Sequence, residues 1–212
     1  MAPRKTPSLW EIMEESISFL SENYQLEGLL DKNSLDHGVV ITHPHPLYGG
    51  DMHNFIVDLI ARTYQKKDFT TLRFNFRGTG KSRGSYDDGV GEQEDVGSAL
   101  STLKQMGIKN IDLAGYSFGA WVNALATGKS DFVENMVMVS PPVGFVDFSP
   151  VNSISCLKLV ITGSMDDVAP ADRIKTMCPG WNPKAQLKII NGADHFYSGC
   201  LDELASILSS YI

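Results

Sequence analysis

The chain has 212 residues, of which 42% are hydrophobic, and a formal net charge of -7. This length supports one hydrophobic core, so we expect a single domain over residues 1–212. Its acidic residues are spread along the chain and its one basic cluster, at residues 3–5, is short, which argues against a nucleic-acid backbone as partner. No apolar run is long enough to cross a bilayer, so we expect no membrane insertion.

The three cysteines, Cys156, Cys178 and Cys200, are odd in number and lack CxxC spacing. They therefore indicate no disulfide framework. We also find no charged-then-apolar leader at the amino terminus, so secretion is not indicated. We expect a cytoplasmic protein, either a monomer or a homodimer.

Taken in chain order, the first segment is ambiguous. Residues 8–20 are compatible with a helix, whereas residues 16–20 and 24–30 are compatible with an antiparallel hairpin, which we favour.

Six short β-rich runs follow, and several are continuously apolar, as expected of strands buried on both faces of a mostly parallel sheet. They cover residues 38–44, 70–76, 110–116, 135–141, 156–163 and 186–193. Segments with a helical pattern separate or follow these runs, at residues 54–67, 91–106, 118–129 and 200–212. This alternation predicts an α/β fold with helices on both faces of the sheet.

Two Gly-x-Ser-x-Gly motifs occur, GYSFG at 115–119 and GKSRG at 80–84. The motif carries chemistry only at a tight strand-to-helix turn, where the serine hydroxyl is exposed above the sheet. Residues 115–119 have that context, which makes Ser117 the candidate nucleophile, whereas Ser82 runs into a loop. The overlapping GTGKS lacks the first glycine of a phosphate-binding loop, because Asn75 stands at that position.

A serine nucleophile requires a base, and the base requires an acid that orients it. In an open α/β sheet both should follow later strands. His195 is the only histidine after Ser117 in the chain, and it follows the last predicted strand. Asp166 and the adjacent Asp167 follow the strand before it; we choose Asp166, and treat Asp194 as a residue that shapes the histidine loop.

GYSFG, GSMDDVAP at 163–170 and NGADHFY at 191–197 resemble the α/β-hydrolase fold over nearly the whole chain. THPHPLYGGDMHN at 42–54 and FNFRGTGKSRG at 74–84 are similar to the small, lidless bacterial members that carry an HPHP motif. The resemblance implies a triad of Ser117, His195 and Asp166, and its GxxDxxxP pattern favours Asp166 over Asp167. It implies no cofactor.

Acyl transfer also needs two amides that face the developing oxyanion. The amide of Phe118, the residue after the nucleophile, is one. The second is expected in the loop after residues 38–42, where His43, His45, Leu47 and Tyr48 have amide protons and the prolines have none. By the resemblance, we favour His45, with Leu47 as the fallback.

Two other polar groups have alternative interpretations. The histidines of the HPHP region, His43, His45 and His53, could form a metal site, but no nearby cysteine or clear second carboxylate completes one, so we expect no metal. Arg77 could neutralise an acidic substrate, but we favour a role in bracing loops through hydrogen bonds to backbone carbonyls.

The predicted substrate is a small acyl compound. Residues 142–155 are too few for a cap domain, so we expect an open crevice for short or medium acyl groups. Its candidate walls are apolar or aromatic: Leu47, Tyr48, Phe118, Phe145, Phe148 and Phe196. The sequence thus predicts a carboxylic-ester hydrolase; the alternatives are a thioesterase or peptidase with the same triad, and a non-catalytic binding protein on a hydrolase fold.

Overall fold

A computed structural model describes residues 14–127 and 133–212. The chain starts there with an antiparallel hairpin, in which β1 (Glu15–Ser21) pairs with β2 (Tyr24–Asp31). The predicted hairpin is therefore confirmed. The part of the alternative helix that covers residues 8–13 lies outside the described residues.

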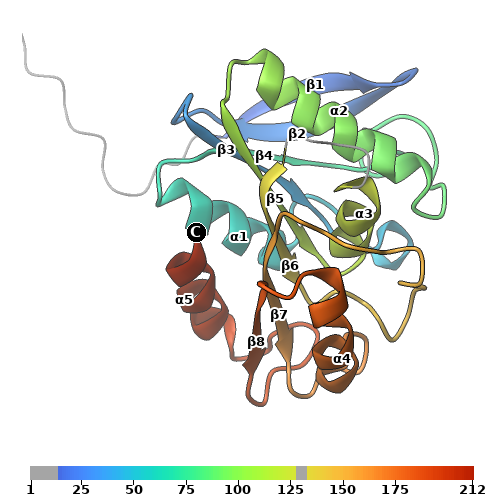
Figure 1. Ribbon diagram of the computed structural model, residues 1–212. Helices are drawn as coiled ribbons and strands as arrows, with labels where there is room; N and C mark the ends of the chain where they lie inside the picture. The colour runs from blue at the N-terminus through green and yellow to red at the C-terminus, as the bar shows by residue number, and fades with distance from the viewer. Residues whose placement is uncertain (1–13, 128–132) are drawn as a thin grey trace, which may run out of the picture.

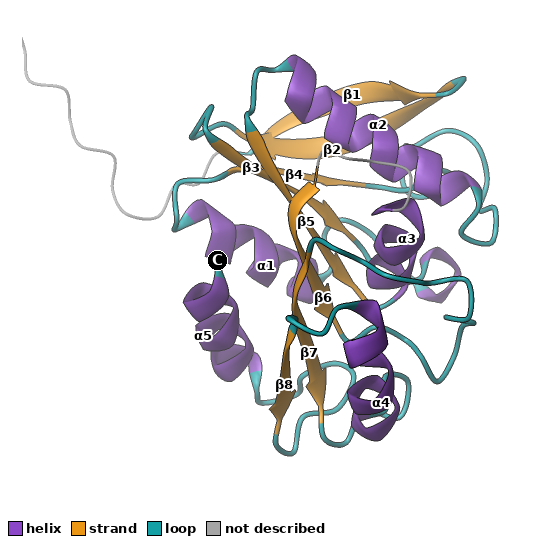
Figure 2. Ribbon diagram, viewed as in Figure 1, coloured by secondary structure: helices purple, strands orange, loops and turns teal. Residues whose placement is uncertain are grey.

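Six further strands complete one sheet with the order β1-β2-β4-β3-β5-β6-β7-β8 (Figures 1 and 2). They are β3 (His37–Thr42), β4 (Thr70–Phe74), β5 (Asn110–Tyr116), β6 (Val133–Val139), β7 (Leu157–Gly163) and β8 (Gln186–Ile190). The pairs from β4 to β8 are all parallel, and β2 is the one described strand that runs in the opposite direction, since it is antiparallel to both β4 and β1. All six carboxyl ends of the parallel strands consequently meet at one edge, where loops from distant parts of the sequence converge.

Helices cover both faces of the sheet, as predicted. In Figure 1, α1 (Phe55–Gln65) and α5 (Leu201–Tyr211) lie on one side of the strands. The other side is covered by α2 (Gly91–Gln105), α3 (Phe118–Ala126) and α4 (Ala171–Trp181).

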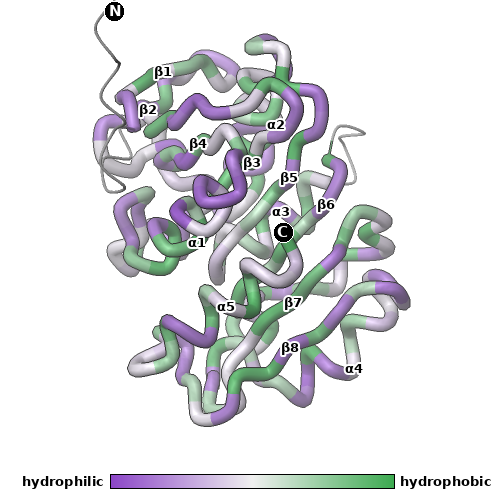
Figure 3. The backbone as a smooth tube through the Cα atoms, turned by 90° about the vertical axis from the view of Figure 1, so that its left-hand side faces the viewer, coloured by the Kyte–Doolittle hydropathy of each residue, from purple (hydrophilic) through white to green (hydrophobic). Residues whose placement is uncertain are grey.

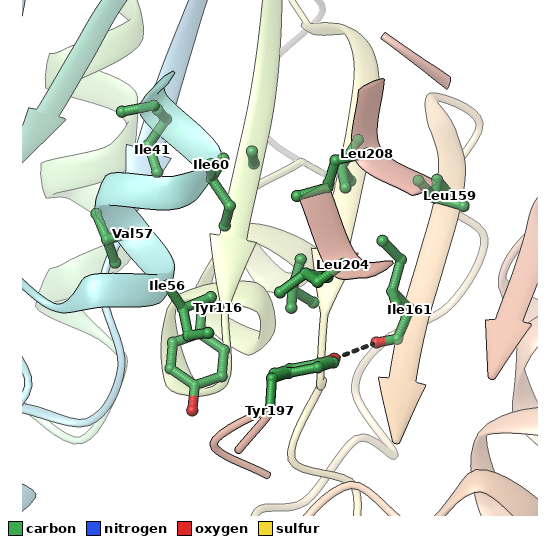
Figure 4. Packing of buried hydrophobic residues seen from close by; sticks show 14 of the residues in the cluster. Ile41, Ile56, Val57, Ile60, Tyr116, Leu159, Ile161, Tyr197, Leu204 and Leu208 are labelled. Atoms are coloured by element: carbon green, nitrogen blue, oxygen red, sulfur yellow. Dashed lines mark hydrogen bonds between the residues drawn. The ribbon is translucent and has the colours of Figure 1, made fainter. Parts of the chain in front are cut away.

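Successive side chains of a strand point to opposite faces of the sheet, so each inner strand contributes to the core on both faces. Val39 and Ile41 of β3 pack towards α1 and α5, whereas Val40 between them packs towards α2 and α3. On the face covered by α1 and α5, Ile60 of α1 and Leu204 of α5 belong to one cluster of buried side chains, part of which Figure 4 shows. Because both faces of the inner strands are buried, a strand such as β7 is coloured mainly as hydrophobic in Figure 3.

Helix α4 was absent from the helices predicted above. Its sequence contains Pro179 and Gly180, both poor helix formers, and it buries only Ile174, Cys178 and Trp181. Packing of these three side chains against β6 and β7 compensates for the weak local pattern.

The connection between β6 and β7 contains no helix or strand over residues 142–155, so no cap domain covers the sheet edge there. Within the described parts of the chain, no helix is long and apolar enough to cross a membrane.

Candidate active site

Ser117 occupies the turn between β5 and α3 with φ 54° and ψ -120°, a conformation that costs a non-glycine residue about 1–3 kcal/mol. The flanking glycines allow this turn to lie against the end of β3. A Cβ on Gly115 would lie 2.6 Å from Thr42 Oγ1, and one on Gly119 would lie 2.5 Å from the same atom. The two glycines that flank Ser117 are thus required by the close approach of this turn to the end of β3.

Three side chains from separate loops meet at this turn. Ser117 Oγ lies 2.9 Å from His195 Nε2, and His195 Nδ1 lies 2.9 and 3.0 Å from the two carboxylate oxygens of Asp166. These residues follow β5, β8 and β7, respectively, so the parallel sheet brings together residues up to 78 positions apart.

The contacts determine the tautomer of His195. A carboxylate only accepts hydrogen bonds, so Nδ1 carries the proton and Nε2 faces Ser117 with its lone pair. Burial alone would raise the pKa of Asp166, but the hydrogen bond and charge interaction with His195, together with the amide of Ala169, hold that pKa below its ordinary value. The carboxylate therefore stays ionised beside the imidazole at neutral pH.

The carboxylates of Asp167 and Asp194, next to Asp166 and His195 in sequence, do not contact the His195 imidazole. Asp167 is exposed, in contrast to Asp166, which is 3% exposed. Asp194 accepts hydrogen bonds from the amides of Phe196 and Ser198 and from the Ser198 hydroxyl, so it closes the turn that carries His195.

The loop after β3 folds into a tight 3-10 turn at Pro46–Tyr48. The amide of Tyr48 donates to the carbonyl of His45, and the amide of Leu47 donates to His45 Nδ1 at 3.3 Å. The amides of His45 and Phe118, in contrast, donate to no other described residue. Of the two predicted donors in this loop, Leu47 is therefore occupied and His45 is available.

The imidazole of His45 is held from both sides. Because Nδ1 accepts from Leu47, Nε2 carries the proton and lies 3.2 Å from the hydroxyl of Tyr86. Burial and the nearby Asp88 carboxylate raise the pKa of Tyr86 to about 12, so this hydroxyl stays protonated. Burial lowers the pKa of the His45 imidazole.

A cavity of about 400 Å³ opens beside Ser117 and His195. The loop after β3 contributes Pro44, His45, Tyr48, Gly49, Gly50 and Asn54 to its wall, and the remainder comes from Tyr116, Phe145, Val168 and Phe196. None of these side chains belongs to Asp, Glu, Lys or Arg, so the cavity suits an uncharged group.

Three of the predicted crevice residues lie elsewhere. Phe148 is buried and packs against Trp181, with 5.3 Å between the ring centroids, because the loop after β6 turns it into the core. Leu47 is exposed but does not line the cavity, and the Phe118 side chain is buried under α2.

Sequence reasoning missed several residues that support the site. The hydroxyl of Tyr116, directly before the nucleophile, donates to the carbonyl of His195 at 2.8 Å. Tyr197, two residues after the histidine, lies 2.8 Å from the Ser140 hydroxyl and donates to the carbonyl of Ile161 (Figure 4). Their only sequence signal is their position next to the motif residues.

Arg77 is buried in an ion pair with Asp95, at 2.8 Å, and also contacts Glu22. It braces the loop after β4 as expected, but through carboxylates and not through backbone carbonyls. Ser82 is buried too, and its hydroxyl donates to the carbonyl of Asn75.

Both ring nitrogens of His43 are hydrogen-bonded to backbone groups. Its Nδ1 donates to the carbonyl of Pro44 at 2.7 Å, and its Nε2 accepts from the amide of Phe76 at 3.0 Å. Burial lowers the pKa of His43 to about 4. Among residues 14–127 and 133–212, no group of three His, Cys, Asp or Glu side chains is placed to hold a metal ion.

No model of a protein family matches the sequence. An uncharacterized protein of Rickettsia prowazekii is 33% identical over 208 residues, which cover 92% of this chain and 87% of that protein. An α/β serine hydrolase homologue from Coxiella burnetii is 33% identical, with a TM-score of 0.86 over 92% of this chain and 96% of the other. An α/β serine hydrolase without a lid, from Xanthomonas campestris, is 27% identical, with a TM-score of 0.85 and coverage of 96% and 95%.

A mostly parallel sheet with an antiparallel first hairpin and a serine at the turn after β5 defines the α/β-hydrolase class. The chain belongs to the α/β-hydrolase superfamily, and it is a hydrolase of the lidless form. The finer likeness to members with an HPHP loop stays a prediction.

Proposed function

We propose that this protein is a serine hydrolase that cleaves carboxylic esters with short to medium acyl groups through an acyl-enzyme. The observation that carries the proposal is the chain of hydrogen bonds from Ser117 Oγ through His195 to Asp166. At the Ser117 end of this chain lies an uncharged cavity that has room for a small ester.

In the first half-reaction, Ser117 Oγ attacks the ester carbonyl carbon while His195 Nε2 takes the hydroxyl proton. The carbonyl electron pair moves onto oxygen, and the amides of Phe118 and His45 stabilise that oxyanion. The ionised Asp166 stabilises the imidazolium. When the tetrahedral intermediate collapses, the carbon–oxygen bond to the alcohol breaks and Nε2 protonates the leaving alkoxide, which leaves an acyl group on Ser117.

In the second half-reaction, water replaces the alcohol. His195 takes a proton from the water as its oxygen attacks the acyl carbon, and the same two amides hold the second oxyanion. Collapse returns the proton to Ser117 Oγ and releases the carboxylic acid. Each amide of such a hole typically contributes about 3–4 kcal/mol to the transition state.

The wall of the cavity favours esters over the alternatives with the same triad. A peptidase that recognises a charged chain terminus needs a fixed opposite charge, and a carrier thioester brings phosphates. Among the described residues, no Asp, Glu, Lys or Arg lines the cavity. A hydrogen-bonded serine, histidine and aspartate also argues against a non-catalytic protein.

The test is a burst experiment with p-nitrophenyl esters of increasing acyl length, followed by intact-mass analysis after rapid acid quenching. We expect turnover that is highest for short to medium chains and a mass increase equal to one acyl group on Ser117. Ser117→Ala should abolish both, whereas Ser82→Ala should retain appreciable activity. Turnover by Ser117→Ala at the wild-type rate, or faster cleavage of matched thioesters or anilides than of esters, would contradict the proposal.

A further inference from the structure

Asn54 lies where the loop after β3 enters α1, and most of its polar groups have partners. Its amide donates to the carbonyl of Asp51 at 3.1 Å, and its carbonyl accepts from the amide of Asp58 at 2.9 Å. Its side-chain Oδ1 caps the helix by accepting from the amide of Ile56 at 2.9 Å. This cap fixes the orientation of the carboxamide, because the opposite orientation would place two donors face to face.

The remaining group is Nδ2. It has two N–H bonds and donates to no other described residue, and Asn54 is a wall residue of the catalytic cavity. The other polar side chains of that wall are already engaged: the His45 imidazole with Leu47 and Tyr86, and the Tyr116 hydroxyl with the carbonyl of His195. Apart from the reacting residues and the exposed Tyr48, Asn54 is therefore the residue with an unused side-chain donor in this wall.

Asn54 is half-buried, and a ligand that fills the cavity and contacts its side chain removes water from this donor. Much of the cavity wall carries no polar side chain, as at Pro44, Phe145, Val168 and the two glycines after Tyr48. A donor that loses its water without finding an acceptor weakens binding, whereas a hydrogen bond to the ligand avoids that loss. A purely hydrocarbon substrate would thus bind less well here than one that carries an oxygen near Asn54.

On this basis we propose that Asn54 is a specificity-determining residue, which selects uncharged esters that carry an acceptor oxygen, such as an ether or carbonyl, outside the ester that is cleaved. The inference rests on the proposed esterase function and adds the substrate class. A neutral hydrogen bond should give a preference of about fivefold in kcat/KM, which corresponds to about 1 kcal/mol.

The test compares ester pairs in which an oxygen replaces one methylene: methoxyacetate against butanoate, methoxypropanoate against pentanoate, and, on the alcohol side, methoxyethyl against butyl acetate. The kcat/KM ratio within each pair is measured for the wild type and for Asn54→Ser. Serine keeps the helix cap but has no amide donor in this place. Dividing the wild-type ratio by the variant ratio cancels the intrinsic reactivity of each ester, which is the same for both proteins.

We expect this quotient to be about fivefold for at least one pair and near one for the others, which would also show where the oxygen binds. Asn54→Asp keeps the cap and lacks the donor as well, so it should show the same loss. Asn33→Ser, at the opposite end of the sheet beside Thr70, is the matched control and should give a quotient of one for every pair.

A quotient within twofold of one for every pair, in proteins that still hydrolyse the alkyl esters, would overturn the inference and leave the esterase proposal intact. If the wild type hydrolyses none of the esters, the proposed function fails and the inference fails with it. Thermal unfolding of each variant establishes that the helix cap is retained.

Discussion

Replacing Asp166 by asparagine should convert His195 to the wrong tautomer without moving it. The Oδ1 atom of Asp166 accepts from the amides of Val168 at 3.0 Å and Ala169 at 2.7 Å, so an asparagine would keep its oxygen on that side. Its amino group would then replace Oδ2, which lies 2.9 Å from His195 Nδ1. The imidazole would have to accept at Nδ1 and carry its proton on Nε2, where it cannot receive the proton of Ser117.

This loss is large because it removes the general base and the charge that stabilises the imidazolium together. In a serine protease with the same geometry such a change lowers kcat about ten-thousandfold, equivalent to about 5.5 kcal/mol of transition-state stabilisation. Asp167→Asn alters an exposed carboxylate in the same turn and should change kcat by no more than about twofold.

The assay is steady-state hydrolysis of p-nitrophenyl butanoate by both variants at neutral pH, with thermal unfolding to establish that each is folded. Equal effects of the two substitutions, or an Asp166→Asn protein that keeps more than about a tenth of the wild-type kcat, would refute the assignment of Asp166.

Three further predictions concern the surroundings of the proposed triad. Tyr86→Phe removes the hydroxyl 3.2 Å from His45 Nε2 and should lower kcat about threefold to tenfold with little change in KM, because the loop of the proposed oxyanion hole loses this contact. A rise in KM alone would contradict this role. Gly119→Ala places a Cβ 2.8 Å from a backbone carbonyl and should lower the free energy of unfolding by about 1–3 kcal/mol. The control Gly97→Ala lies inside α2, where the added Cβ meets no atom within 4 Å, and it should raise the free energy of unfolding by about 0.5–1 kcal/mol. Equal effects of the two substitutions in urea unfolding would be inconsistent with close packing at the turn. The pKa of His43 is about 4 in the fold and 6.5 as the ordinary value, so between these pH values the unfolded chain binds a proton that the folded chain does not. The free energy of unfolding should therefore fall by about 2 kcal/mol from pH 7 to pH 5 through this group. His43→Gln should show a correspondingly shallower dependence of stability on pH, and an unchanged dependence would contradict this prediction.

The strands and most helices could be predicted because their signals are local. Runs such as residues 110–116 and 157–163 are mostly apolar, and the structure buries nearly all of their residues on both faces. Helix α4 could not be predicted, since its stability comes from Trp181 and Cys178 packing against strands distant in sequence, and its own Pro179 gives the opposite signal.

The proximity of the candidate site residues could also be anticipated, because parallel strands place their following loops at one edge. Ser117, Asp166 and His195 each follow such a strand, and the structure places their side chains within hydrogen-bond distance. The path of the irregular loops could not be anticipated. Phe148 turned into the core and Tyr86 turned towards His45 because of contacts that no local pattern encodes.

The central claim is that Ser117 is an activated nucleophile, and covalent labelling with a fluorophosphonate probe tests it without knowledge of the substrate. Intact mass followed by peptide mapping should show one adduct per chain, on Ser117, at a rate that Asp166→Asn reduces strongly and Ser82→Ala does not. An adduct on another residue, or none on folded protein, would contradict the account.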